Sequence, residues 1–147
     1  MTTSQIRFLM CAPEHYDVDY VINPWMEGNI HKSSQERAVQ QWGKLHNVLK
    51  LHAIVDLVKP HKGVPDMVFT ANAGLVLGKN VVLSRFLHKE CQGEEPYFKA
   101  WFEENGFTVY ELPKDLPFEG AGDALLDREG RWLWAGYGFR SELDSHP

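Results

Sequence analysis

The chain has 147 residues, of which 44% are apolar and 24% are charged, so it is long enough for one globular domain with a buried core. Its net charge is -5 and its Lys and Arg residues form no cluster longer than a pair, which argues against nucleic acid and membrane surfaces as partners. Residues 1–10 are too short and too polar for a secretory signal, and no apolar run approaches a membrane span, so we expect a cytoplasmic protein.

The first predicted elements are a strand and a long loop. Residues 7–10 (Arg-Phe-Leu-Met) form a short apolar run typical of a strand. The loop that follows carries Pro13, Asn23, Pro24 and Gly28 and is longer than a simple connection requires. Loops of this length often carry function, so we expect residues of this loop to belong to a site.

A helix and a second strand complete the first part of the chain. Residues 33–36 (Ser-Ser-Gln-Glu) have the order of a capping box, which predicts a helix from about Ser34 to His52. Its inward face is expected to consist of residues that recur at helical spacing, namely Val39, Trp42, Leu45 and Leu49. Residues 53–58 then alternate as a strand that ends before Pro60.

The next segment is predicted to be a strand-strand-helix-strand unit. Residues 74–77 and 81–84 are two apolar runs on either side of a Gly-Lys-Asn turn, a pattern that predicts a hairpin. A helix is expected over residues 94–105, with Tyr97, Trp101 and Phe102 inward, and Gly106 ends it. Residues 108–112 form the last strand of the unit.

The same order begins again about fifty residues further on. Residues 124–127 and 132–135 flank an Arg-Glu-Gly turn and predict another hairpin. Repeats of this kind bury their faces by stacking or by closing into a ring, so the pattern predicts an incomplete array of α/β units. The alternative is a free-standing α/β sandwich whose hairpins are evenly spaced by coincidence. Aromatic residues are expected in the core, namely Trp42, Phe98, Trp101, Phe102, Trp132 and Trp134.

Two segments carry the residues best suited to a binding site. Residues 68–72 (Val-Phe-Thr-Ala-Asn) and 118–123 (Phe-Glu-Gly-Ala-Gly-Asp) each place an acid or an amide at the end of an apolar, strand-like run. Asn72, Glu119 and Asp123 are acceptors that could hold a planar cation such as a guanidinium, and the two glycines allow close approach of the backbone.

Each of these three residues also has a structural interpretation. Asp123 could cap a turn, Asn72 could take a left-handed turn position before Gly74, and Glu119 could be a solvated loop acid. Attack on the central carbon of a guanidino group further requires a nucleophile such as a thiolate. The residues after Asp123 offer no nucleophile with a base beside it.

The cysteines and histidines give no further catalytic signal. Cys11 and Cys91 lie far apart, which fits reduced thiols, and the sequence alone assigns neither of them a cation or base that would activate it. The seven histidines show no metal-ligand spacing, so no metal site is predicted. No glycine-rich phosphate loop is present, so no cofactor is predicted either.

Five sequence motifs, taken together, resemble a known family. They are Cys11-Ala12-Pro13, residues 21–29 (Val-Ile-Asn-Pro-Trp-Met-Glu-Gly-Asn), residues 65–74 (Pro-Asp-Met-Val-Phe-Thr-Ala-Asn-Ala-Gly), Ser84-Arg85-Phe86 and residues 118–123. In this order they closely resemble the amidinotransferase (pentein) superfamily. The match is closest to its arginine dihydrolase branch, the N-terminal enzyme domain of cyanobacterial-type arginine-degrading proteins, and it runs from about Phe8 to the last residue.

The resemblance implies a fold and an activity. The fold would be an α/β propeller of five strand-strand-helix-strand units around a central site, of which residues 1–147 would be the N-terminal portion. The activity would be the hydrolysis of arginine to ornithine, ammonia and carbon dioxide through a cysteine-linked intermediate. Family members use a histidine and a C-terminal cysteine, which are expected beyond residue 147, so no catalytic residue is assigned here and the chain is expected to be inactive alone.

The resemblance also assigns roles to six residues. Asn23 and Asn29 would belong to the substrate entrance loop, and Arg140 would bind the amino-acid carboxylate. Guanidino and substrate contacts would come from Asn72, Glu119 and Asp123. Relatives that stop after one hydrolysis carry Asp at the position of Asn72, and an amide there would suit a neutral ureido intermediate.

One position departs from the family pattern. Relatives tend to have an arginine where this chain has Cys91, and a thiol cannot replace that charge. The loss of one charge-assisted contact is worth about 1.5 to 3 kcal/mol, so substrate affinity is expected to suffer.

Other functions stay open from the sequence alone. The chain could be a non-catalytic module that binds arginine or another guanidino compound, or an interaction domain. Open strand edges invite pairing with another chain, so self-association and pairing with a C-terminal half are both expected possibilities.

Overall fold

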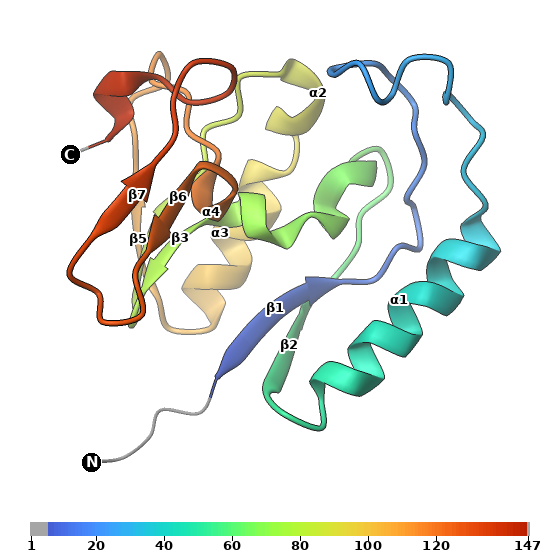
Figure 1. The fold of residues 1–147 in the computed structure, drawn as a ribbon, viewed down its shortest axis with the longest axis horizontal. Coiled ribbons are helices and arrows are strands. Elements are labelled where there is room, and N and C mark those ends of the chain that lie inside the picture. The colour runs from blue at the N-terminus through green and yellow to red at the C-terminus, as the bar shows by residue number, and fades with distance from the viewer. Residues whose placement is uncertain (1–5, 147) are drawn as a thin grey trace. The chain divides into compact units, whose positions relative to one another are not determined.

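The computed structural model describes residues 6–146, which divide into two compact units with the boundary between Thr70 and Ala71. Helices and strands occur in both units, so the chain has a mixed α/β fold, as the sequence predicts (Figure 1). None of the helices in this described range is both long and apolar enough to span a membrane. Residues 1–5, the first half of the N-terminal segment that is too polar for a secretory signal, lie outside the described residues.

The first unit is built on a parallel pair of strands. Strand β1 (Arg7–Cys11) pairs with β2 (Ile54–Val58), and the register runs from Arg7 opposite Ile54 to Cys11 opposite Val58. Parallel neighbours need a crossover connection, which here contains helix α1 (Gln35–Leu49). The guanidinium of Arg7 donates to both carboxylate oxygens of Asp56 at 3.0 and 2.8 Å and links the two strands on an exposed face.

Helix α1 ends at Leu49, three residues before the predicted end at His52, and it differs from its prediction in two further respects. Its N-cap is Ser34, whose hydroxyl accepts a hydrogen bond from the backbone N–H of Arg37, so the cap lies one residue later than the capping-box order of residues 33–36 indicates. No residue of α1 is buried, and Val39 and Leu45 are 45% and 54% exposed. The predicted inward face is therefore wrong for these positions.

Two 3-10 helices follow β2 where the sequence suggested a strand-like run. Helix η1 (Pro65–Val68) begins at Pro65, whose fixed φ suits a first helical position, and it buries Met67. Helix η2 (Thr70–Ala73) contains Asn72. The strand-like reading of residues 68–72 is therefore wrong, and the residues at the end of this run lie on tight turns.

The second unit contains the predicted strand-strand-helix-strand order. Strands β3 (Gly74–Leu77) and β4 (Asn80–Leu83) form an antiparallel hairpin, and β4 pairs in parallel with β5 (Thr108–Glu111). The crossover contains the short helix α2 (Lys89–Gln92), which was not predicted, and α3 (Glu95–Glu104), which was. Phe98 and Phe102 of α3 are buried as predicted.

A second hairpin begins after residue 119. The one-turn helix α4 (Gly120–Asp123) leads into β6 (Ala124–Leu126), which pairs antiparallel with β7 (Leu133–Ala135), and a 3-10 turn, η3 (Leu143–Ser145), follows. Trp132 and Trp134 are 66% and 70% exposed, so their predicted place in the core is wrong. Tyr97 of α3, predicted inward, is also exposed.

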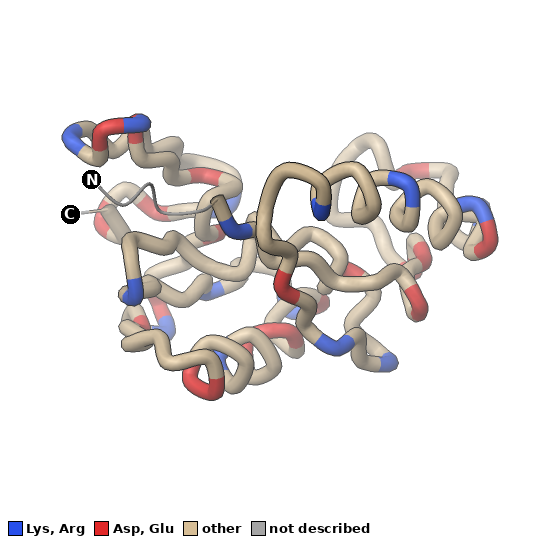
Figure 2. The backbone as a smooth tube through the Cα atoms, turned by 90° about the horizontal axis from the view of Figure 1, so that it is seen from below, with Lys and Arg blue, Asp and Glu red and all other residues tan. Residues whose placement is uncertain are grey.

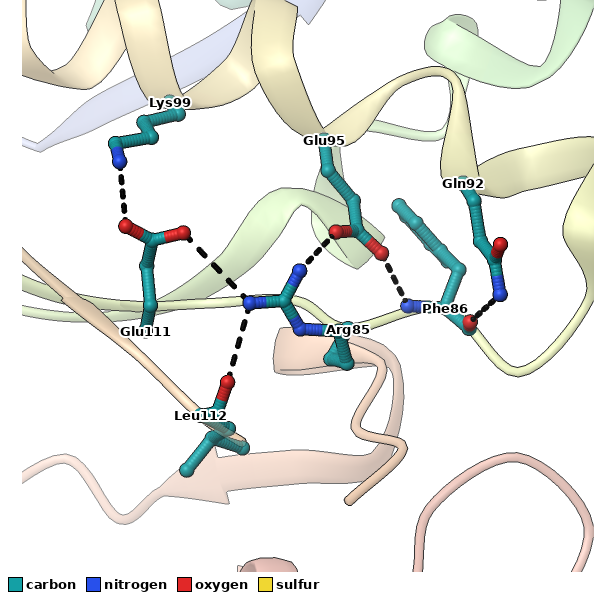
Figure 3. Close-up of polar contacts among 7 residues, drawn as sticks. All are labelled: Arg85, Phe86, Gln92, Glu95, Lys99, Glu111 and Leu112. Atoms are coloured by element: carbon teal, nitrogen blue, oxygen red, sulfur yellow. Dashed lines mark hydrogen bonds and ion pairs between the residues drawn. The ribbon is translucent and has the colours of Figure 1, made fainter. Parts of the chain in front are cut away.

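A polar network ties α3 to the strands beside it (Figure 3). The guanidinium of Arg85, just beyond β4, donates to Glu95 Oε2 at 2.5 Å and to the carbonyl oxygen of Leu112 at 3.1 Å. The other oxygen of Glu95 accepts from the backbone N–H of Phe86 at 2.9 Å. Lys99 and Arg85 both pair with Glu111, the last residue of β5. The network therefore fixes the first turn of α3 against the ends of β4 and β5.

Charged residues of both signs are interspersed along the backbone. Figure 2 shows Lys and Arg positions interspersed with Asp and Glu positions over the described chain. This distribution agrees with the sequence, whose basic residues form no cluster longer than a pair.

Candidate functional site

The candidate site lies in the second unit, where the turn before β6 meets the loop after β7. Phe118 forms an isolated antiparallel bridge with Arg85, which sets the start of the turn. Gly120 then takes a φ of +53°, and a Cβ on it would lie 2.7 Å from the backbone nitrogen of Gly74 and 2.8 Å from Ser84 Oγ. Only glycine fits this combination of conformation and contact, so Glu119 is turned into the unit and Asp123 follows one helical turn later.

The loop after β7 is attached to this turn at both ends. The backbone N–H of Gly136 donates to the carbonyl oxygen of Asp123 at 2.7 Å, and that of Glu142 donates to the carbonyl oxygen of Pro117 at 2.9 Å. Residues 136–142 are thereby held over residues 117–123. This attachment places Arg140 and Ser141 directly against the acidic residues of the turn.

Arg140 bridges the two carboxylates. Its Nη1 donates to Glu119 Oε2 at 3.0 Å and its Nη2 donates to Asp123 Oδ1 at 2.5 Å. The side chains of Glu119 and Asp123 are 5% and 15% exposed, whereas that of Arg140 is 38% exposed. A guanidinium is thus held by one nitrogen on each of two partly desolvated acids, a strong charge-assisted arrangement.

Ser141 supports the same turn through the carboxylate of Asp123 and the backbone of Glu119. Its hydroxyl donates to Asp123 Oδ2 at 2.8 Å and accepts from the backbone N–H of Glu119 at 3.0 Å. The residue is only 3% exposed. Ser141 was not singled out from the sequence, because a lone serine in a loop has no distinguishing neighbours. It fixes which oxygen of Asp123 faces the guanidinium.

Asn72 completes the cluster of predicted acceptors. A Cβ on Gly122 would collide with Asn72 Oδ1, so the amide lies directly against the backbone between Glu119 and Asp123. The structure therefore brings Asn72, Glu119, Asp123 and Arg140 together in one unit. Their assignment as substrate contacts stays a prediction.

The structure does not support the purely structural roles considered for Asn72, Glu119 and Asp123. Glu119 is 4% exposed, so it is not a solvated loop acid. Asn72 is not in the left-handed region, since His31 is the only non-glycine residue with positive φ in the described range. Both carboxylate oxygens of Asp123 bind side chains, Arg140 and Ser141, in place of a backbone cap.

A hollow of about 210 Å³ adjoins the cluster. It is lined by Asp123, Gly136, Tyr137, Phe139 and Arg140. Its volume is below the roughly 300 Å³ at which ligand pockets begin, so the hollow admits a small polar group but does not enclose a whole amino acid.

Asn23 and Asn29 lie in the first unit, in the loop between β1 and α1. The side-chain oxygen of Asn23 accepts from the backbone N–H groups of Trp25 and Met26, both at 3.1 Å. The amide of Asn29 donates to the carbonyl oxygen of Trp25 at 2.9 Å. Both amides therefore shape the tip of this loop. Their predicted role at a substrate entrance stays a prediction.

The two ends of this loop are joined by a polar clamp that the sequence did not reveal. Asp17 accepts hydrogen bonds from the Ser33 hydroxyl, from His31 Nδ1 at 2.8 Å and from the backbone N–H of Val18 at 2.8 Å. These bonds lower the pKa of Asp17 to about 2, the Ser33 bond contributing most, and the bond to Asp17 raises the pKa of His31. Asp19 lies 3.5 Å from the same ring nitrogen.

The clamp also has the geometry of a small cation site. The ligand atoms of Asp17, Asp19 and His31 all lie within 4.8 Å of one another. The sequence did not predict this grouping, because the residues are brought together by the fold of the loop and not by a regular spacing. Asp19 and His31 are exposed, as is common for acidic groups that bind no metal.

A further hydrogen bond anchors the loop to η1. The hydroxyl of Tyr20 donates to Asp66 Oδ2 at 2.8 Å. Burial raises the pKa of Asp66, the bond from Tyr20 lowers it, and nearby Asp19 raises it, with a net increase. The two cysteines, Cys11 and Cys91, are buried thiols that form no disulfide, in agreement with the sequence.

Comparisons with known proteins identify similar chains. Residues 15–145 match the family described as N,N dimethylarginine dimethylhydrolase, eukaryotic. The chain is 86% identical over 145 residues to the bifunctional arginine dihydrolase/ornithine cyclodeaminase AgrE of Nostoc sp., covering 99% of this chain and 21% of that protein. It is 88% identical over 142 residues to the protein of the same description, ArgZ, of Synechocystis sp., covering 97% and 20%.

A solved structure is equally similar. The crystal structure of the N-terminal domain of ArgZ, as a cysteine-to-serine mutant bound to substrate, is 88% identical and superposes with a TM-score of 0.94, covering 96% of this chain and 52% of that one. The chain thus spans about a fifth of the length of the two curated relatives and about half of the solved domain.

Proposed function

The chain belongs to the N,N-dimethylarginine dimethylhydrolase family, and from this premise we propose that it is the N-terminal part of a guanidino-group hydrolase resembling arginine dihydrolase. The substrate would be arginine. Two waters would convert it to ornithine, carbon dioxide and two molecules of ammonia. Two relatives that are 86% and 88% identical carry arginine dihydrolase in their names, which supports this choice over the dimethylated substrate in the family description.

The observation that carries the proposal is the guanidinium already held in the cluster. Glu119 and Asp123 accept from the two terminal nitrogens of Arg140, so their spacing and orientation suit a planar guanidino group. A free arginine presents the same planar, positively charged group. The acceptors would hold its edge while the central carbon faces an attacking group.

The remaining predicted contacts would complete the substrate site. The amide of Asn72, beside Gly122, would contact the guanidino group and the neutral ureido group formed after the first hydrolysis. Asn23 and Asn29 would form the substrate entrance, and Arg140 would bind the amino-acid carboxylate. Cys91, buried in α2, cannot make the cationic contact that an arginine at this position would make, and substrate binding would be weaker as a result.

The reactive groups would come from residues that this sequence does not contain. A cysteine would attack the guanidino carbon and a histidine would transfer protons, as the family resemblance implies. The substrate-bound relative is a cysteine-to-serine mutant, which supports a cysteine in the reaction of that domain. The two units would form part of a propeller of strand-strand-helix-strand repeats, completed by a C-terminal half that pairs through the open strand edges.

Calorimetry and product analysis together test the proposal. We expect the 147-residue chain to bind arginine in the millimolar range or tighter and to release neither ornithine nor ammonia. Glu119→Gln should abolish the binding, because it removes a charge from the acceptor pair. Glu129→Gln, in an exposed turn of the same unit, is the matched control and should leave binding unchanged. Robust turnover by the chain alone would contradict the proposal that the nucleophile comes from residues outside this sequence.

One observation favours a second candidate function, a protein-interaction module. Four aromatic residues on and after the second hairpin are 66% to 94% exposed, namely Trp132, Trp134, Tyr137 and Phe139. Exposed aromatic groups of this kind are enriched at protein interfaces. Sedimentation would show a concentration-dependent mass without any effect of arginine if this function were the correct one.

A further inference from the structure

We infer that Arg140 is an internal ligand of the guanidino-binding acceptors and that the chain selects its ligand by exchanging this guanidinium for another one. The inference rests on the proposed function and adds to it a rule of specificity. A ligand that carries both a guanidino group and a carboxylate is favoured, because only such a ligand provides a new partner for the displaced Arg140.

Both acceptors already pair with one guanidinium, that of Arg140. Asp123 directs one oxygen to Arg140 Nη2 at 2.5 Å and the other to the Ser141 hydroxyl at 2.8 Å. Glu119 is 5% exposed at its side chain and meets Arg140 Nη1 at 3.0 Å. A ligand guanidinium that takes these two contacts therefore replaces Arg140.

Arg140 is the movable member of the cluster. Its side chain is 38% exposed and lines the hollow, whereas those of Glu119 and Asp123 are 5% and 15% exposed. The acids are also positioned by the backbone turn at Gly120 and by Ser141, which bonds the carboxylate of Asp123 and the backbone N–H of Glu119. Displacement would therefore move the arginine toward the hollow and leave the acids in place.

Displacement has a cost that depends on the ligand. Arg140 loses two charge-assisted contacts when a foreign guanidinium takes its place. An arginine ligand restores one charge-assisted contact, because its carboxylate can accept a hydrogen bond from the displaced Arg140 side chain. Agmatine, which is arginine without the carboxylate, carries the same guanidino group but offers no anionic partner. The exchange therefore penalises agmatine relative to arginine by the value of one charge-assisted contact.

Binding of arginine and agmatine to the unmodified chain and to Arg140→Gln tests the inference by calorimetry. We expect the unmodified chain to prefer arginine by about tenfold or more. In Arg140→Gln the acceptor oxygens are no longer held by a guanidinium, and no displaced cation needs a new partner. Agmatine should therefore bind at least about tenfold more tightly than before, and the preference for arginine over agmatine should fall towards unity. Arg131→Gln removes the same charge from an exposed ion pair in the same unit and should change neither affinity.

A second variant and a spectroscopic measurement guard against a folding defect. Arg140→Lys keeps the charge without the fork, so its preference for arginine should lie between those of the other two proteins. In the unmodified chain, guanidinium chloride should shift the side-chain Nε–Hε signal of Arg140, and sodium chloride at equal ionic strength should not.

The possible failures separate the inference from the function. If the unmodified chain binds arginine but agmatine gains nothing in Arg140→Gln, the exchange is wrong and the proposed function stands. If neither ligand binds to any of the proteins, the proposed function and the exchange are both overturned.

Discussion

Asn72 and Gly122 come into direct contact, although fifty residues of sequence separate the segments that carry them. The amide oxygen of Asn72 occupies the space that a side chain at position 122 would need. Gly122 also contributes its carbonyl oxygen to the environment of Arg140, at 3.4 Å from Nη2. The shape of the candidate site therefore depends on the smallest residue in it.

Gly122→Ala is expected to disrupt the site. The new Cβ would collide with Asn72 Oδ1, and relief of the clash would cost about 1 to 3 kcal/mol and displace the amide from the acids. Arginine binding measured by calorimetry should fall at least tenfold. The matched control is Gly136→Ala, where a Cβ would meet only the carbonyl oxygen of Asp123 at an ordinary 3.7 Å. Equal losses in both variants would contradict this account.

Ser141→Ala tests the support of the two acids. The change leaves the buried N–H of Glu119 and one oxygen of Asp123 without the hydroxyl, which should lower the free energy of unfolding by about 1 to 3 kcal/mol. Arginine binding should weaken as well, because Asp123 is no longer oriented. Ser145→Ala serves as the comparison, since that hydroxyl bonds only the nearby carbonyl oxygen of Glu142. Urea unfolding and calorimetry measure the two effects, and a change in stability without a change in binding would limit Ser141 to a structural role.

Arg85→Leu should be among the most destabilising changes in the second unit. The side chains of Arg85 and Glu95 are 17% and 11% exposed, so removing the cation leaves a largely buried carboxylate, at a cost of about 3 to 5 kcal/mol. The double change Arg85→Leu with Glu95→Gln should recover part of this loss, because the amide can still accept from Phe86. Urea unfolding of the four proteins forms a double-mutant cycle, and strict additivity would show that the pair is not coupled.

The hydrogen bonds among Asp17, His31 and Ser33 should make the stability of this loop depend on pH, with one limit at low pH and one at higher pH. The pKa of His31 is raised by Asp17, so the stabilisation from protonated His31 is fully present below its ordinary pKa and is lost as the pH rises through the raised value. The pKa of Asp17 is lowered to about 2, so its contribution is present above its ordinary pKa of 3.8 and is lost as the pH falls towards 2. The protection factor of the His31 amide in hydrogen exchange should therefore be highest between these two pH limits, since its N–H donates to the carbonyl oxygen of Val18.

In His31→Gln the loss of stability at higher pH should disappear, and the loss of stability towards pH 2 should remain. The matched control is His46→Gln, on α1, where the ring stacks on Trp42 and takes no part in the clamp. An upper limit that persists in His31→Gln would assign the dependence to a different group.

Asp66→Asn should make the first unit less sensitive to pH. Burial raises the pKa of Asp66, so the folded state favours the protonated carboxyl, and stability declines as the pH rises from the ordinary pKa to the raised one. An amide removes this decline and keeps an oxygen for the Tyr20 hydroxyl. Thermal unfolding at pH 4 and at pH 7 should show a smaller difference in the variant, and Asp115→Asn, on an exposed loop, provides the comparison.

Much of the fold could be predicted from local patterns. Apolar runs and turn residues located all seven strands, β1 to β7, to within a residue, and Gly106 marked the end of α3. The 3-10 helices η1 and η2 were missed, because residues 65–73 are apolar enough to resemble a strand and their tight turns are set by Pro65 and by tertiary contacts. Trp132 and Trp134 were misplaced because periodicity indicates an apolar face without showing what covers it.

The candidate site was predictable only in part. Paired acids and flanking glycines in residues 118–123 indicated an acceptor cluster, and the structure brings Asn72 into it. Ser141 and the clamp of Asp17, His31 and Ser33 could not have been found, because single polar residues acquire a role only when folding places them beside a carboxylate.

The exposed tryptophans make the chain suitable for fluorescence spectroscopy. Three of its five indoles, those of Trp25, Trp132 and Trp134, are at least 66% exposed. Even the folded chain should therefore emit at long wavelength and be quenched by iodide or acrylamide. Any protein that covers the second hairpin would shift this emission to the blue and shield two of these indoles from the quencher, so complex formation could be followed without an added dye.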